Sequence, residues 1–241
     1  MNNLKMNLFD VMNRKRRYAD PPEKFLRYWQ DFLYNRCNEW GYQMREDTQF
    51  GIRKTVDCFA ARRVHEISVA AQKHSEQECP IYRSPKGVLL CGGVGTGKTT
   101  LLQILSKPSE PEYLENSCVI RYKGAAYISV TDILGALLKG GREFAESFCK
   151  RYRRDLLVID DLGQEGDMTF YGTKISKFIE LIIERRYQHF ETTGAVTVIA
   201  TNLQPANLEQ TYDERTVSRL AAMTEIIPFN GTDWRKTGGT I

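Results

Sequence analysis

The chain has 241 residues, of which 41% are hydrophobic and 27% are charged, and its formal net charge is +4. These values are ordinary for a globular protein with one large domain, or with a core domain and a small extension. No apolar run approaches the roughly 20 residues of a membrane-spanning helix, and the N-terminus lacks a secretory signal pattern. We therefore expect a cytoplasmic protein. Its six cysteines form no Cys-x-x-Cys pair, which predicts reduced thiols rather than a zinc ribbon or redox site.

The first 80 or so residues have a helical pattern and no strand pattern. Asp20-Pro21-Pro22-Glu23 is typical of a helix start, with Asp20 as the cap and an acid in the first turn. Apolar residues follow at helical spacing, break near Gly41, and resume from about Asp47. They are Phe25, Trp29, Phe32 and Leu33, then Phe50, Val56, Phe59, Val64 and Ile67. We expect them mainly to pack two helices together, in a module over residues 1–80 that could also hold a partner protein.

The chain changes character between Pro80 and Pro85, where ECPIYRSPKG is typical of a linker. Beyond this segment, short β-branched runs alternate with helical stretches. Such alternation predicts an α/β fold, with a parallel five-stranded sheet that is flanked by helices on both faces. The expected strands are 87–91, 125–130, 156–160, 196–201 and 226–229, and the expected helices occupy much of 98–106, 131–139, 173–190 and 213–223.

Residues 92–99 match the phosphate-binding pattern G-x-x-x-x-G-K-[ST] in full, between a predicted strand and a predicted helix. Glycines allow the backbone amides to point at phosphate oxygens, and the N-terminus of the next helix adds a positive dipole end. We expect Lys98 to reach the β- and γ-phosphates of ATP, and the Thr99 hydroxyl to bind Mg²⁺. The expected ATP-binding residues are Gly92, Gly93, Val94, Gly95, Thr96, Gly97, Lys98, Thr99 and Thr100.

Two other apolar strands end in polar residues that suit such a loop. Asp160 is expected to hold Mg²⁺ through water, and Asp161 to orient the attacking water as a base. Many AAA+ ATPases have glutamate at the second position, so the shorter aspartate predicts slow hydrolysis. In an AAA+ sheet, strand 196–201 lies between the P-loop strand and the Asp160 strand. Asn202 would then face the attacking water as a γ-phosphate sensor, the alternative being an ordinary turn asparagine.

Arg215 and Arg219 lie four residues apart, on the same face of the last predicted helix. Arginines of this kind can reach a neighbouring subunit's ATP and neutralise charge in the transition state. We expect Arg219 to be such a finger and Arg215 to assist it. The alternative is a solvated, salt-bridged helix face.

Taken together, these motifs resemble the DnaC/IstB-type AAA+ ATPases, which include bacterial replicative helicase loaders and transposition helper ATPases. The resemblance covers roughly residues 85–236. It is carried by GVLLCGGVGTGKTTLL, LLVIDDLGQE, ERRY, IATNL and YDERTVSRLAAMTEIIPFNGTDWR. It implies an AAA+ P-loop NTPase domain over residues 81–241 without a C-terminal lid, in which Arg235 is the candidate substitute for a second sensor arginine.

The resemblance also implies an ATP-dependent helicase loader in DNA replication. Residues 1–80 would grip the replicative helicase, and the ATPase domain would form a homo-oligomer that binds single-stranded DNA. Hydrolysis at the subunit interfaces would be slow and stimulated by the partner or by DNA. Basic residues with Tyr127, Phe144 and Tyr152 interleaved are the candidate DNA contacts, although a solvated basic helix is the alternative for each. They are Lys139, Arg142, Lys150, Arg151, Arg153 and Arg154.

Three other functions stay open at this point. A transposition helper would use the same motor with a different partner. An adaptor switched by ATP would scarcely hydrolyse it, which the short Asp161 side chain allows. A small-molecule phosphotransferase would need an acceptor pocket and commonly an arginine-bearing lid, whereas Asn202 and the paired arginines favour an oligomeric motor.

Overall fold

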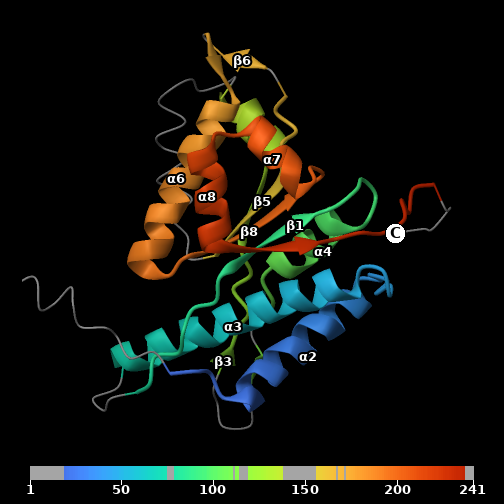
Figure 1. The fold of residues 1–241 in the computed structure, drawn as a ribbon. Coiled ribbons are helices and arrows are strands. Elements are labelled where there is room, and N and C mark those ends of the chain that lie inside the picture. Colours follow the sequence, from blue (N-terminus) through green and yellow to red (C-terminus); the bar gives the residue numbers. More distant parts are fainter. Residues whose placement is uncertain are drawn as a thin grey trace, which may run out of the picture.

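The computed structural model describes residues 19–74, 79–110, 112–113, 119–137, 156–166, 168–170 and 172–236. These residues form a five-stranded parallel sheet with helices on both faces, preceded in the chain by two long helices (Figure 1). The strand order is β4-β5-β8-β1-β9. The predicted fold class is confirmed. No helix in the described part of the chain is long and apolar enough to span a membrane.

The sheet strands follow the aliphatic runs of the sequence. They are β1 (Gly87–Cys91), β4 (Ala126–Ser129), β5 (Leu156–Leu162), β8 (Val196–Thr201) and β9 (Thr224–Pro228). The strands β1 and β8 are buried along their whole length, as expected for central strands of a parallel sheet. Two short antiparallel hairpins lie outside the sheet. One joins β2 (Glu112–Tyr113) to β3 (Val119–Ile120), and the other joins β6 (Thr169–Phe170) to β7 (Thr173–Lys174).

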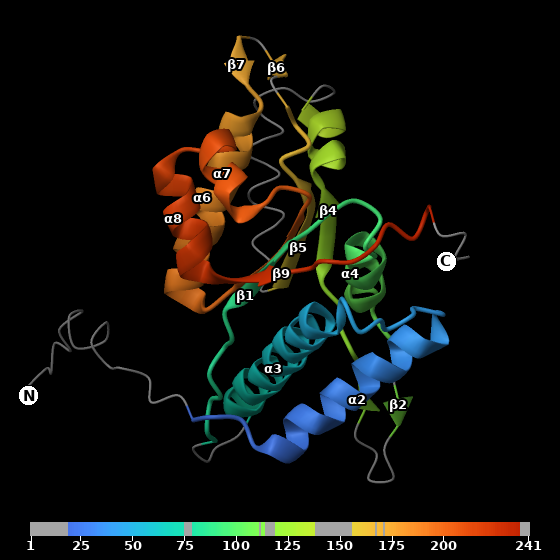
Figure 2. The same ribbon diagram turned by 45° about the vertical axis from the view of Figure 1, so that its right-hand side comes forward.

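Helices lie on both faces of the sheet. Figure 2 shows α6 (Ser176–Thr193), α7 (Pro205–Thr211) and α8 (Glu214–Met223) on one side of the sheet and α4 (Lys98–Ser106) on the other. A helix that begins at residue 130 is described up to residue 137. The helix predicted from residue 173 begins only at Ser176, because Thr173 and Lys174 form β7. The predicted helix 213–223 is α8, with Asp213 as its N-cap.

The N-terminal helices α2 (Glu23–Glu39) and α3 (Gln49–His74) pack on the sheet as well as on each other. Leu33 of α2 and Phe59 of α3 share one hydrophobic core with Val88 and Leu90 of β1. The expectation that their apolar residues mainly join the two helices is therefore incomplete. Some of these residues face solvent instead: Phe25, Phe50 and Ile67 are 44%, 49% and 41% exposed.

The start of α2 differs from the prediction. Pro22 occupies the N-cap position, and no side chain caps the helix, so Asp20 does not have the predicted role. The prolines still suit a helix start because they lack an amide donor.

Hydrogen bonds hold residues 82–86, which lie between α3 and β1, along α3. The Cys58 thiol donates to the Lys86 carbonyl at 3.3 Å, and the Ser68 hydroxyl accepts from the Tyr82 amide at 3.0 Å. Arg62 Nη1 donates to Ser84 Oγ at 2.9 Å. Side chains on one face of α3 therefore hold residues 82–86 in place, and this connecting segment is packed along the helix. The hydrophobic core runs across the predicted boundary at residue 80.

The cysteines in the described residues are free thiols, as predicted. Cys37, Cys58 and Cys91 are buried, and Cys79 is half-buried. Burial raises the pKa of Cys37 and of Cys91 to about 11, so these thiols stay protonated near neutral pH.

Candidate functional site

The loop between β1 and α4 has the backbone that its glycines predict. Gly95 and Gly97 have φ angles of 75° and 93°, in the left-handed region that favours glycine. The fit around Gly95 is also tight, since a Cβ atom there would lie 1.8 Å from Asp233 Oδ1. The loop can therefore keep its curled form only with glycine at these two positions.

The Lys98 side chain turns back over this loop. Its ammonium donates to the Gly92 carbonyl at 2.8 Å, the Gly93 carbonyl at 2.7 Å and Asn202 Oδ1 at 3.0 Å. Burial lowers the pKa of Lys98 to about 8, against the opposing effect of the Asp160 and Asp161 carboxylates. An anionic phosphate beside this amine would stabilise its charged form.

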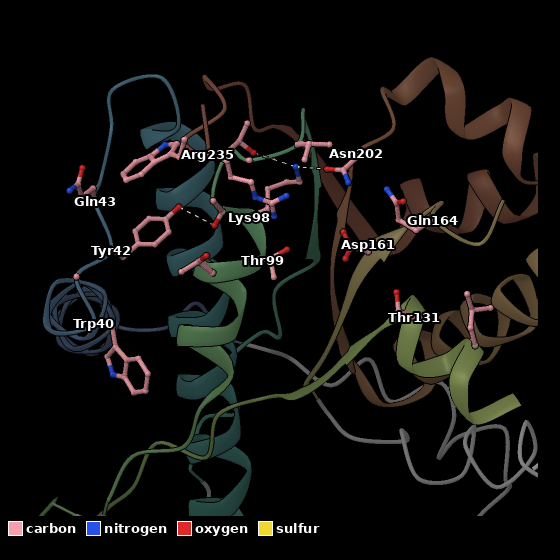
Figure 3. A pocket seen from close by; sticks show the side chains of 18 of the residues that line it. Trp40, Tyr42, Gln43, Lys98, Thr99, Thr131, Asp161, Gln164, Asn202 and Arg235 are labelled. Atoms are coloured by element: carbon pink, nitrogen blue, oxygen red, sulfur yellow. Dashed lines mark hydrogen bonds between the residues drawn. The ribbon is translucent and has the colours of Figure 1, made fainter. Parts of the chain in front are cut away.

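A cavity of about 600 Å³ opens over the loop, a size that suits a nucleotide. Figure 3 shows Lys98 and Thr99 near its centre, with Asp161, Gln164 and Asn202 on one side and Tyr42 and Gln43 on the other. The structure thus brings Asp161 and Asn202 to the same cavity as the loop. The lining residues that the sequence predicted for ATP binding or catalysis are Val94, Gly95, Thr96, Gly97, Lys98, Thr99, Thr100, Asp161 and Asn202.

Asp160 and Asp161 have different surroundings. Asp160 is 1% exposed and does not line the cavity; its oxygens accept from the Asp161 amide at 2.9 Å and the Tyr127 hydroxyl at 2.5 Å. Asp161 has a φ angle of 59°, the only positive φ outside glycine among the described residues, and β5 shifts register here. At this irregularity near the end of β5, Asp161 lines the cavity. Burial and the Asp160 charge raise the pKa of Asp161, while Lys98 and Arg235 oppose that change.

The donor chemistry around Thr99 and Asp160 suits Mg²⁺. Hydroxyl and carboxylate oxygens are the ligands that this ion prefers, and each carboxylate oxygen of Asp160 keeps a second lone pair beside its hydrogen bond. No group of three or more acidic, histidine or cysteine side chains in the described part of the chain could hold a metal alone. A magnesium ion here would therefore need phosphate and water ligands as well, as is usual for nucleotide-bound Mg²⁺.

Tyr127, which we expect among the aromatics that stack on DNA bases, is half-buried in β4, and its hydroxyl contacts Asp160 and Gln103. Its stacking on DNA bases stays a prediction. All six basic candidates for DNA contacts, Lys139, Arg142, Lys150, Arg151, Arg153 and Arg154, lie outside the described residues, as do Phe144 and Tyr152.

Two distant segments complete the cavity wall. Trp40, Tyr42 and Gln43 come from the turn after α2, and Trp234 and Arg235 come from the end of the described chain. The Trp234 amide donates to the Gly95 carbonyl at 3.0 Å, and the Tyr42 hydroxyl donates to the Gly97 carbonyl at 3.4 Å. The aromatic residues of this wall were not predicted as site residues. The helix break at Gly41 and the closing D-W-R were the only sequence signals for it.

Arg215 and Arg219 lie apart from this cavity. They line a separate surface hollow on α8, together with Tyr187, Glu214, Ser218 and Ala222. Arg219 Nη2 lies 3.1 Å from Glu184 Oε1 on α6, whereas Arg215 is exposed. Neither arginine lines the P-loop cavity of its own chain.

The chain matches no protein-family model and no curated protein. Solved structures with a similar arrangement include AMPPCP-bound DnaA from Aquifex aeolicus, at 22% identity and a TM-score of 0.43. A DnaI crystal structure has 15% identity and a TM-score of 0.45, and DnaA bound to AMPPCP and single-stranded DNA has 20% and 0.42. These matches cover 70%, 77% and 71% of this chain, and 45%, 87% and 46% of the respective structures. The chain thus spans less than half the length of the two DnaA structures.

Proposed function

We propose that this chain is an AAA+ ATPase that acts in the initiation of DNA replication, as a loader of the replicative helicase. The observation that carries the ATPase part is the convergence of Lys98, Asp161 and Asn202 on one cavity over a glycine-constrained loop. The loader part rests on the resemblance of residues 85–236 to the DnaC/IstB-type ATPases and on the exposed apolar groove of the N-terminal helices.

Each residue has a distinct role in the proposed hydrolysis. Lys98 exchanges its loop carbonyl partners for β- and γ-phosphate oxygens, which keep its ammonium charged. Asp161 accepts a proton from the attacking water, a role favoured by its raised pKa. Asn202 holds that water or the γ-phosphate. A bound Mg²⁺ would neutralise phosphate charge, and Thr99 and Asp160 are the residues that would hold it.

The site is proposed to be completed by a second copy of the chain. Charge that develops on the transferred phosphoryl group needs a cation, and Arg219 and Arg215 lie on another surface of the same subunit. Arg219 of a neighbouring subunit would supply that cation.

A mixing experiment tests this shared site. Lys98→Ala removes the phosphate-binding ammonium but keeps the arginines, and Arg219→Ala does the reverse. Each variant alone should lose at least about 100-fold in turnover, since an arginine finger contributes about 10³–10⁵. Mixing the two should restore part of the activity, because some interfaces then combine an intact loop with an intact arginine. Arg185→Ala, on the exposed face of α6, is the matched control and should retain activity. A mixture as inactive as its components would rule out the shared site.

The partner surface is proposed to be an apolar groove on the N-terminal helices. A cavity of about 650 Å³ lies between α2, α3 and residues 79–82, and its walls include the exposed side chains of Phe25, Tyr28 and Ile67. Exposed apolar surface of this kind is typical of a protein interface. The replicative helicase is the proposed occupant, and single-stranded DNA is proposed to bind the basic residues between 139 and 154.

The helicase proposal is tested by affinity capture of the full chain from its host with ATP present. We expect mass spectrometry to identify the replicative helicase, and Ile67→Asp to abolish its capture. Leu181→Asp, at a similarly exposed apolar position on α6, should leave capture unchanged. Capture of a transposase without helicase would replace the loader by a transposition helper. Equal capture of helicase by both variants would mean that the helicase binds another surface of the chain.

A further inference from the structure

A buried carboxylate and a buried tyrosine connect the loop after Asp161 to the start of α8. Glu165 is 0% exposed and Tyr212 is 2% exposed. The Tyr212 hydroxyl donates to Glu165 Oε1, and the Gly163 amide donates to Oε2 at 3.0 Å. A buried carboxylate is costly unless donors satisfy it, and here each oxygen has one. The pair is therefore a specific contact between two segments 47 residues apart in sequence.

The loop end of this contact belongs to the nucleotide cavity. Gln164, next to Glu165 on the turn after β5, lines that cavity, as does Asp161 near the end of β5. The end of β5, from which this turn starts, is also held to the end of β8 beside Asn202, since the Thr201 hydroxyl donates to the Leu162 carbonyl at 2.6 Å. A bound nucleotide that displaces this turn would therefore also displace Glu165.

The other end of the contact belongs to the helix that carries the arginines. Tyr212 directly precedes Asp213, the N-cap of α8, whose Oδ1 accepts from the Thr216 amide at 2.8 Å. Besides this link, α8 is held by α6, through Glu184 to Arg219 and through Lys177 to Asp213. Tyr212 therefore attaches the N-terminal end of α8 to the cavity loop, while α6 supports its side.

We propose that the Glu165–Tyr212 hydrogen bond positions α8 relative to the cavity loop, so that each subunit holds its arginines where the nucleotide of the next subunit can meet them. The proposal rests on the shared site proposed above. Neither residue lines the nucleotide cavity, so both are positioning residues and not catalytic ones. Because a helix moves as a rigid rod, loss of the Tyr212 contact shifts Arg219 without altering Lys98 or Asp161.

The test adds Tyr212→Phe to only one of the two mixed chains at a time. In the mixture of Lys98→Ala and Arg219→Ala chains, the first chain supplies the arginine and the second supplies the loop. Adding Tyr212→Phe to the arginine-supplying chain should lower restored turnover about tenfold, as expected for a lost hydrogen bond to a charged group. Adding it to the loop-supplying chain should cost less than about twofold. Equal losses on both sides, or a loss confined to the loop-supplying chain, would overturn the proposal.

Tyr122→Phe is the matched control, since it removes another buried tyrosine hydroxyl, which donates to the Leu105 carbonyl at 2.6 Å away from α8. It should leave restored turnover unchanged on either side. Amide hydrogen exchange on the full-length Tyr212→Phe protein provides a readout that does not need a shared site. Exchange should accelerate at residues 163–165 and 213–217 while β1 stays protected. Unchanged exchange at both segments would overturn the link itself. An inactive mixture of Lys98→Ala and Arg219→Ala chains would instead contradict the shared site.

Discussion

The Lys98 ammonium combines two properties that rarely occur together in a lysine. It is buried, which lowers its pKa to about 8, and its hydrogen-bond acceptors among the described residues are neutral oxygens of the loop and of Asn202. A triphosphate would exchange these neutral partners for charged ones. The free protein therefore loses the positive charge of Lys98 in a pH range where ATP is fully ionised.

Nucleotide affinity should consequently fall as pH rises through about 8. Below that pH the free protein already carries the charged amine, so binding needs no proton. Above it, binding must first protonate Lys98, and the apparent Kd should rise by up to about tenfold per pH unit. Calorimetric titration with a non-hydrolysable ATP analogue between pH 7 and pH 9.5, in buffers of different ionisation enthalpy, would measure both affinity and proton uptake. Lys98→Arg is the control because arginine stays charged throughout. Affinity and proton uptake that stay constant up to pH 9.5 would contradict this prediction.

At the same scale, the sequence predicted those site residues whose role depends on local chain geometry. Gly95, Gly97 and Lys98 belong to one contiguous pattern, and the structure brings them together as the pattern implies. Trp40 and Trp234 reach the same cavity from segments 194 residues apart, so no local spacing could reveal them. The contact between Tyr127 and Asp160 could not be predicted either, because an aromatic near basic residues gives no indication of a buried carboxylate partner on the next strand.

At the scale of the elements, the central strands were the easiest to predict. The strands β1 and β8 have the predicted ends because each is a mainly aliphatic run, closed by Gly92 after β1 and by Asn202 after β8. The helix predicted from residue 173 begins late because Thr173 pairs with Phe170 in a short hairpin, which depends on a neighbouring segment rather than on helical periodicity. The spacing of apolar residues in α2 and α3 predicts that each helix has an apolar face. The same spacing cannot predict that the sheet covers part of that face.

The contact between α3 and residues 82–86 gives a prediction about stability. Arg62 is 3% exposed and donates to Ser84 Oγ at 2.9 Å and to the Gly194 carbonyl at 3.0 Å. Arg62→Met keeps the packing of the long side chain but leaves these acceptors without that donor. The free energy of unfolding should fall by about 1–3 kcal/mol, measured by urea denaturation.

Arg27→Met is the control for this variant. Arg27 forms an exposed ion pair with Glu23 one turn along α2, and such pairs contribute little. Its substitution should change the free energy of unfolding by less than about 0.5 kcal/mol. Equal stability of the two variants would mean that the buried contacts of Arg62 do not hold residues 82–86 to α3.

At the scale of the whole molecule, the helices α2 and α3 share a hydrophobic core with the sheet. Their side chains Leu33, Val56 and Phe59 are 0% exposed and belong to the core that covers one face of the sheet. The approach of α3 to the sheet is close: a Cβ atom on Gly51 would lie 2.4 Å from Phe229 Cδ2, just after β9. A partner that binds α2 and α3 would thus act on elements that also support the nucleotide site.

This shared core predicts that residues 81–241 do not fold alone, although they contain the whole sheet and the P-loop. Without α2 and α3, the aliphatic side chains of one sheet face lose their cover, and Trp40 and Tyr42 are lost from the cavity wall. Near-UV circular dichroism and urea denaturation of this fragment should show no fixed tertiary packing and no cooperative transition, and the fragment should bind more of the dye ANS than the intact chain. The full-length Ile67→Asp protein is the reference, because it alters the exposed groove while the core stays intact. If the fragment instead unfolded cooperatively and bound nucleotide, α2 and α3 would be a separable module, and a partner could move them without disturbing the ATPase site.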